Sequence, residues 1–259
     1  MVDLATTGAA SVTIVNAGSG DDILTQVTSG AGSGVALNGE ADSDTITIQN
    51  SGATSVTLAT GGTENDMIEI RNAGADSRVQ ADGDAGEDTI SLRALPATAQ
   101  AQLNGGADKD VISLGSTDDA TSVLSNILGT VMIDGGTHPA VPTMSESVTA
   151  KGVTVTATVP MGDTLNLNDQ GHAAAAQYNL ADGTFNRDTT VSVSRFSEIA
   201  TINLITGTAS NDINIIDTPE TSQTTVTSQD EADDIDVTTT GDNSILIVNA
   251  AGDIDMVDL

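Results

Sequence analysis

Apolar and polar residues alternate in short segments that recur with a period of about 22 residues over positions 1–114 of the chain. Each segment has two apolar columns with a polar column between them. The first apolar column holds Leu24, Ile46, Ile68, Ile90 and Ile112, the second holds Gln26, Ile48, Ile70, Leu92 and Leu114, and the polar column holds Thr25, Thr47, Glu69, Ser91 and Ser113. Alternation with a period of two is typical of a strand with one buried face. The pattern therefore predicts one β-strand in every repeat.

A second, weaker strand is expected before the turn of each repeat. Its inward columns are Thr13, Val35, Thr57, Val79 and Ala101, followed by Val15, Leu37, Ala59, Ala81 and Leu103. Helix signals are missing, because apolar residues do not recur at spacings of three and four, and Gly, Asn and Asp interrupt the chain every dozen residues. Two short strands in every repeat predict an all-β, right-handed parallel β-helix (β-solenoid), in which one repeat forms one coil. The stacked coils join the apolar columns into a core.

The repeat divides the chain into three regions. Residues 1–114 form regular coils, the spacing breaks down over residues 115–200, and regular coils resume over residues 201–259. We expect the middle region to be the same solenoid with loop insertions, because it keeps coil-like pieces such as TVMIDGG, GVTVTATV, GDTLNL and TVSVSRF. In the last region Asp212 and Asp234 are separated by one full repeat, but the apolar columns lie one residue closer to them. A turn that is one residue shorter, or bulged, is expected there.

Both ends of the sequence fall in the phase of a core strand. Met1-Val2-Asp3-Leu4 is repeated as Met256-Val257-Asp258-Leu259, and neither end shows a polar or helical cap. Solenoid ends are normally capped because an open coil leaves strand edges unpaired. Two interpretations follow: the chain is a segment of a longer repetitive protein, or its copies stack end to end into a filament.

Charge and composition exclude several classes of protein. The chain carries 7 Lys and Arg against 37 Asp and Glu, a formal charge of −30, which repels nucleic acids and anionic lipids. No apolar run approaches the roughly 20 residues of a membrane-spanning helix. The chain has no Cys, no Trp, 1 Tyr and 2 Phe, so its core depends on Val, Ile, Leu and Ala. Such a core suits thin, repeated layers.

Candidate chemistry lies in the turn before each strand. One aspartate precedes the strand in every regular repeat: Asp22, Asp44, Asp66, Asp88 and Asp110. The segment from Gly61 to Glu69 matches the nonapeptide G-G-x-G-x-D-x-U-x except at its fourth position, Glu64, and the segment from Gly105 to Ser113 departs there too, with Asp108. In these turns the sequence resembles the repeats-in-toxin family of haemolysin-type calcium-binding proteins and large bacterial β-solenoid surface proteins.

The resemblance implies a secreted bacterial β-roll whose glycine-rich turns and aspartates bind Ca²⁺ between stacked coils. The ligands that it implies are the five aspartates of the regular repeats together with Asp42, Gly62, Glu64, Asp108, Asp212 and Asp234. Family members string nonapeptides in tandem, whereas this chain has a single nonapeptide in each repeat. Only one edge of the solenoid is therefore expected to carry ions, at the cell surface or outside the cell.

A physical argument also favours a cation. Carboxylates stacked about 4.8 Å apart repel one another by roughly 1 kcal/mol per neighbouring pair in water, and by more inside a protein. A hard divalent cation with carboxylate and carbonyl ligands would offset this repulsion. The alternative is structural: each Asp caps its turn by a hydrogen bond, and Asn16, Asn38, Thr60, Asp82 and Asn104 form a similar ladder.

Signals for catalysis are weak. Parallel β-helices include enzymes that cleave or epimerise acidic polysaccharides, and His172 and Tyr178 in the irregular region are candidate site residues for such chemistry. His138 has no visible partner in the sequence, and no nucleophile motif, phosphate loop or zinc spacing occurs. The expected function is a non-catalytic, calcium-binding structural or adhesive segment of a secreted bacterial or archaeal surface protein, which associates end to end or continues in a longer chain. A glycan or a cell-surface ligand is a further expected partner, and a lyase- or epimerase-type enzyme is the alternative.

Overall fold

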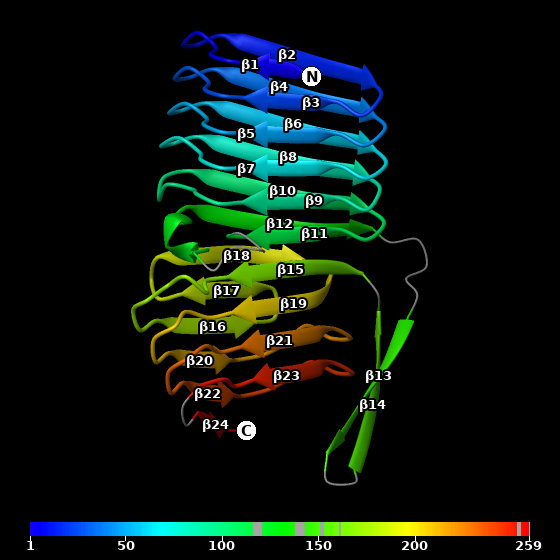
Figure 1. The fold of residues 1–259 in the computed structure, drawn as a ribbon, viewed down its shortest axis with the longest axis vertical. Helices are drawn as coiled ribbons and strands as arrows, with labels where there is room; N and C mark the ends of the chain where they lie inside the picture. The colour runs from blue at the N-terminus through cyan, green and yellow to red at the C-terminus, as the bar shows by residue number, and fades with distance from the viewer. Residues whose placement is uncertain (116–120, 138–142, 151–152, 161, 253–254, 259) are drawn as a thin grey trace.

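The computed structural model describes residues 1–115, 121–137, 143–150, 153–160, 162–252 and 255–258, and over 143–150 and 153–160 it describes the backbone alone. These residues form an all-β solenoid of about ten coils with about 22 residues per coil, as the sequence predicts. Figure 1 shows the coils stacked along the long axis of the molecule, with the two termini at opposite ends. His138 lies outside the described residues.

Two sheets form the walls of the solenoid, and we name them by their size; the strands are parallel except at β17 in the larger sheet. The ten-strand sheet consists, in spatial order, of β1 (Val2–Leu4), β3 (Ile23–Gln26), β5 (Thr45–Ile48), β7 (Met67–Ile70), β9 (Thr89–Leu92), β11 (Val111–Leu114), β15 (Asp163–Asn168), β19 (Ile199–Ile205), β21 (Gln223–Thr227) and β23 (Ile245–Asn249). The twelve-strand sheet consists of β2 (Val12–Ser19), β4 (Gly34–Ala41), β6 (Val56–Thr63), β8 (Arg78–Ala85), β10 (Gln100–Ala107), β12 (Thr130–Thr137), β18 (Val191–Ser197), β17 (Thr184–Arg187), β16 (Gln177–Ala181), β20 (Asp212–Ile215), β22 (Asp234–Val237) and β24 (Met256–Asp258).

The predicted apolar columns form the core between the two sheets. In the ten-strand sheet Leu24 pairs with Ile46, and Ile46 pairs with Ile68, so each partner lies one repeat further along the chain. All three side chains are fully buried, and the same holds for Leu103 and Ile133 of the twelve-strand sheet to within 2% exposure. Stacking equivalent positions in register places apolar side chains of one coil directly on those of the next. A chain with three aromatic residues thereby builds a continuous core.

The irregular region contains two insertions into the coil pattern. The strands β13 (Thr143–Ala150) and β14 (Val153–Pro160) form an antiparallel hairpin that pairs only with itself and stands beside the solenoid in Figure 1. Within the twelve-strand sheet, β16, β17 and β18 form an antiparallel meander that brings the chain back beside β12. A 3₁₀ turn spans Leu124–Asn126. The coil-like segments at β12, β15 and β18 lie in the solenoid, whereas the alternating segment at β14 belongs to the hairpin.

The meander shifts the repeat by half a coil. Two kinds of turn connect the sheets. The turns from the twelve-strand to the ten-strand sheet form the first edge of the solenoid, and the turns that lead back form the second edge. Before the meander the longer strand of each coil lies in the twelve-strand sheet, as β6 and β8 do. After it the longer strand lies in the ten-strand sheet, as β21 does before the shorter β22. The turn that follows the longer strand therefore changes edge.

In the described part of the chain, no helix has the length and apolar character needed to span a bilayer.

Candidate functional site

The aspartates of the regular repeats lie in the turns of the first edge. In each turn the chain leaves the longer strand through residues in the left-handed region, such as Asp42 (φ 72°), Glu64 (φ 73°) and Asp108 (φ 77°). Gly62 has φ 126°, and a side chain there would lie 2.2 Å from the carbonyl oxygen of Glu40 in the preceding coil. Only glycine permits this close approach. The turn is therefore tight and directs the aspartate that follows it, here Asp66, toward the solenoid interior.

A ladder of hydrogen bonds links these aspartates from coil to coil. The backbone N–H of each aspartate donates to the Oδ1 atom of the aspartate in the next coil, and the N···O distances are 2.7–2.8 Å. We call this column the aspartate ladder; its members are Asp22, Asp44, Asp66, Asp88, Asp110 and Asp163. At its first rung the N-terminal ammonium lies 3.2 Å from Oδ1 of Asp22. The ladder satisfies turn N–H groups that have no place in either sheet.

Asp44, Asp66, Asp88 and Asp110 are at most 3% exposed, and their Oδ2 atoms have no hydrogen-bond partner among the described residues. Each Oδ2 instead lies against a glycine of the preceding strand. A side chain added to Gly39, Gly61, Gly83 or Gly105 would come within 2.2–2.4 Å of the Oδ2 atom. A carbonyl oxygen of the neighbouring coil bounds the same space. For example, a Cβ atom added to Gly83 would lie 2.2 Å from the Gly105 oxygen.

Burial raises the pKa of three ladder aspartates above the ordinary value of 3.8, to about 7 for Asp66, about 6 for Asp88 and about 8 for Asp110. The pKa of Asp44 is also raised by burial. The N–H that each carboxylate accepts lowers its pKa, and nearby carboxylates raise it. For Asp66 these neighbours are Asp88, Asp44 and Asp84. For Asp88 they are Asp84, Asp108 and Asp82. For Asp110 they are Asp163, Asp88 and Asp108.

The ladder presents few free oxygen ligands for a calcium ion. Calcium takes six to eight oxygen ligands at about 2.3–2.6 Å. In the ladder Oδ1 already faces an N–H donor, and Oδ2 is packed against a glycine backbone. The described residues contain no group of three or more His, Asp or Glu side chains that could hold a metal ion. Calcium binding therefore stays a prediction, for which a titration is the test.

The acidic residues implied by the resemblance lie on the outside of the same turns. Glu64 and Asp108 are exposed, and Asp42 is half-buried. Oδ2 of Asp42 accepts the backbone N–H of Gly20 at 2.8 Å, so this residue also bonds to the neighbouring coil. Gly62 packs against the carbonyl of Glu40. The structure thus separates a buried ladder from an exposed acidic rim.

In the last region the buried position is one residue earlier than Asp212 and Asp234. Asn211 and Asp233 are buried, and the backbone N–H of Asn211 donates to Oδ1 of Asp233 at 2.7 Å. Asp233 donates likewise to Asp255, at 2.9 Å. We call Asn211, Asp233 and Asp255 the second ladder. It keeps the spacing of two residues to the first apolar position, so no shortened turn is needed.

Asp212 and Asp234 begin β20 and β22 and are exposed. The Asp212 carboxylate accepts hydrogen bonds from the Gln177 and Asn214 side-chain amides. The second ladder lies on the second edge, because the meander has shifted the repeat by half a coil. Sequence reasoning missed Asp163 and Asp233, although both show the signal of an aspartate two residues before an apolar strand position.

Tyr178 and Arg187 form a buried cluster with Asp169 at the meander. Oδ2 of Asp169 accepts hydrogen bonds from the Tyr178 hydroxyl at 2.8 Å and from Nη1 of Arg187 at 2.9 Å. The hydroxyl also accepts the backbone N–H of Gly207 at 2.9 Å. Burial raises the pKa of Tyr178 above its usual range. The Tyr178 side chain is fully buried, and its hydroxyl lies at the junction between the coils before the meander and the coils after it, which we call the two halves of the solenoid. The backbone carbonyl of His172 accepts the N–H of Thr208.

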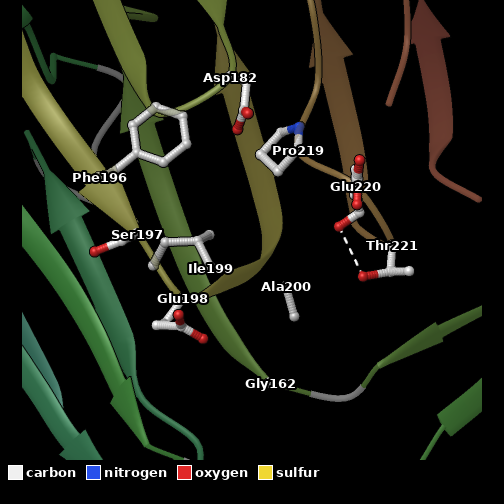
Figure 2. Close-up of a pocket in the computed structure, with 10 residues that line it drawn as sticks. All are labelled: Gly162, Asp182, Phe196, Ser197, Glu198, Ile199, Ala200, Pro219, Glu220 and Thr221. Carbon is white, nitrogen blue, oxygen red and sulfur yellow. Dashed lines mark hydrogen bonds between the residues drawn. The ribbon is translucent and has the colours of Figure 1, made fainter. Parts of the chain in front are cut away.

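A shallow pocket of about 250 Å³ lies on the first edge, beyond the last rung of the aspartate ladder. Figure 2 shows Phe196, Ile199 and Pro219 among its lining residues, with the carboxylates of Asp182, Glu198 and Glu220 around it. All three acidic residues are exposed. The lining residues include neither a basic side chain nor a histidine.

No family model matches the chain, and neither a curated protein nor a solved structure matches it.

Proposed function

We propose that the chain is a non-catalytic structural or adhesive β-solenoid segment of a secreted bacterial or archaeal surface protein, extended by stacking coil upon coil. One observation carries this proposal. Six half-buried apolar side chains pack against the core, and all of them lie in the first or last coils: Leu4, Val15, Ala17, Val237, Leu246 and Val248. In the interior coils the equivalent side chains are covered by the next coil.

The two outermost coils have compatible strand arrangements. The ten-strand sheet begins with β1 at one end and finishes with β23 at the other, and the twelve-strand sheet begins with β2 and finishes with β24. Placing β1 of one coil stack on β23 of another also brings β2 next to β24. Both sheets then continue with the same parallel direction, and Leu246 and Val248 come to lie under Val2 and Leu4. Burying apolar surface of this kind drives association.

Self-association of the purified chain tests the proposal. We expect light scattering and electron microscopy to show rods whose length increases with protein concentration. Replacing the core-facing residue Leu246 by Lys should give monomers, because the charge would be buried at the junction. The matched control is Ile247→Lys, which changes the neighbouring, outward-facing residue of β23 and should leave the rods intact.

Three results would contradict the proposal. The first is a chain that stays monomeric at high concentration. The second is association that is equally sensitive to both substitutions. The third is specific turnover in a screen of uronate and neutral glycans, because it would favour the polysaccharide-active alternative. A substitution of Tyr178 would not separate these functions, since its hydroxyl supports the fold.

A further inference from the structure

The second ladder contains an amide at a position where the aspartate ladder has carboxylates. Oδ1 of Asn211 accepts the backbone N–H of Ala176 at 3.2 Å, and the N–H of Asn211 donates to Asp233. Asn211 is 4% exposed, and Asp44, Asp66, Asp88 and Asp110 are at most 3% exposed. A neutral side chain therefore performs the coil-to-coil contact of this position without a negative charge.

The remaining atoms of Asn211 show what the site requires. Its Nδ2 atom donates to the carbonyl oxygens of Gly207 and Ala209. In the aspartate ladder the space beside Gly39 is bounded by Oδ2 of Asp44 and by the Gly61 carbonyl oxygen, which would lie 2.2 and 2.5 Å from a Cβ atom added to Gly39. An ionised carboxylate offers no donor to such an oxygen, whereas an amide does.

The cost of burying a charge also favours an amide over an ionised carboxylate at this position. Among the described residues, no Lys or Arg side chain forms an ion pair with Asp44, Asp66, Asp88 or Asp110. Removing a charge from water without a partner is unfavourable, and equal charges on successive coils increase the cost. Backbone N–H donors compensate through Oδ1, and an amide oxygen accepts the same donors without adding a charge.

We infer that the aspartate ladder is a column of hydrogen-bond acceptors that folds without calcium and accepts an amide in place of each buried carboxylate. The inference concerns the coil itself, so it holds whether or not copies stack as proposed above. It departs from the calcium chemistry that the turn sequence implies, and the reason is geometric: the carboxylate oxygens face N–H groups and glycine backbone.

The test compares two triple variants of the full chain. The ladder variant carries Asp66→Asn, Asp88→Asn and Asp110→Asn, and the control variant carries Glu64→Gln, Glu87→Gln and Asp108→Asn on the exposed rim of the same turns. Each variant replaces three carboxyl groups by amides. Melting temperatures are measured by circular dichroism at pH 7.5 in chelator, in millimolar Ca²⁺ and in millimolar Mg²⁺, and calcium binding is followed by calorimetry.

We expect the wild-type chain to be folded in chelator, with the same melting temperature in Ca²⁺ as in Mg²⁺. The ladder variant should melt several degrees higher than the control variant, since about 1 kcal/mol corresponds to roughly 2–4 °C in a chain of this size. A further variant, Asp88→Ala, should melt lower than the wild type, because the Asp66 N–H loses its acceptor.

The inference is overturned if Ca²⁺ alone raises the melting temperature of the wild type and the ladder variant loses that rise. It is also overturned if the ladder variant fails to fold while the control variant folds. If calcium stabilises the wild type and the ladder variant equally, but not the control variant, the ions bind the exposed rim, and the ladder itself is calcium-independent as inferred.

Discussion

The two halves of the solenoid place the same kind of turn on opposite edges. Before the meander the buried aspartates lie on the first edge, and serine-containing turns such as Gly52 to Ser55 lie on the second. After the meander the order is reversed, with Asn211 and Asp233 on the second edge and the turn from Gly241 to Ser244 on the first. The type of turn therefore follows the order of long and short strands along the chain. It does not depend on which sheet the chain leaves.

The halves also differ in what faces the ladder. Five residues before Asp44, Asp66, Asp88 and Asp110 the first half has glycine, such as Gly83 before Asp88, and the second half has Ser228 before Asp233. Burial raises the pKa of Asp233, and both the Asn211 N–H and the Ser228 hydroxyl lower it. The first half has no such hydroxyl, and its carboxylates are packed directly on backbone. The two halves therefore differ in the residue beside the carboxylate, although Oδ2 of Asp233 has no hydrogen-bond partner among the described residues, as is also true of Oδ2 of Asp88.

The largest expected effect is on the pH dependence of stability, because Asp66, Asp88 and Asp110 act together. Their folded pKa values lie above the unfolded value of 3.8, so the folded chain binds more protons between about pH 4 and pH 8. Stability from these groups is present below pH 4 and is lost as the pH rises through their folded pKa values. Melting temperatures measured from pH 5 to pH 9 should fall and level off above about pH 8. The ladder variant with three Asn should show a smaller slope than the rim control, and equal slopes would show that general charge repulsion is responsible.

The next largest effect should come from the cluster that joins the halves. Arg187→Met leaves the buried Asp169 carboxylate without its cation, and removing one partner of a buried ion pair costs about 3–5 kcal/mol. Urea unfolding measures this loss. Limited proteolysis at increasing urea concentration should then cleave the second half before the first. The control is Arg93→Met, in which the half-exposed Arg93 loses its ion pair with Glu69, a change of less than about 1 kcal/mol. Similar losses from both substitutions would contradict a special role for the junction.

Alanine five residues before the ladder position should destabilise the first half more than the second. Gly83→Ala places a methyl group 2.2 Å from the Gly105 oxygen and 2.3 Å from Oδ2 of Asp88, and overpacking of this kind costs about 1–3 kcal/mol. Ser228→Ala removes one hydroxyl from a position that already holds a side chain, so the loss should be smaller. The free energy of unfolding from urea titrations measures both. A greater loss from Ser228→Ala would reverse the comparison.

The smallest effect should follow from making the second half more like the first. Asn211→Asp keeps the Oδ1 acceptor but removes the amide that donates to Gly207 and Ala209, a loss of about 1 kcal/mol per hydrogen bond. The loss should increase with pH, because ionisation adds a buried charge. A variant that is as stable as the wild type at pH 8 would show that the two ladders tolerate charge equally.

Much of the coil could be read from the chain, and the exceptions have a common cause. The buried columns at Ile46 and Ile68 are confirmed, because one strand and its tight turn are decided by neighbouring residues. The positions of Asp212 and Asp234 looked equivalent to the ladder, although the buried residues are Asn211 and Asp233. Asn211 and Asp233 each lie two residues before the first buried apolar residue of their strand, and this spacing identifies them. The position of the acidic residues alone does not.

The sequence by itself determined the length of the coil, the faces of its strands and the tight turns, because these depend on residues a few positions apart. Only the tertiary structure decided which strands became neighbours. Asp163 joins the aspartate ladder 53 residues after Asp110, and the alternating segment at Val153–Pro160 leaves the solenoid to pair in a hairpin. Alternation fixes the two faces of a strand but not its partner. The partner follows from contacts between residues distant in the chain, and where the half-coil shift occurs Tyr178 and Arg187 bond to the buried Asp169.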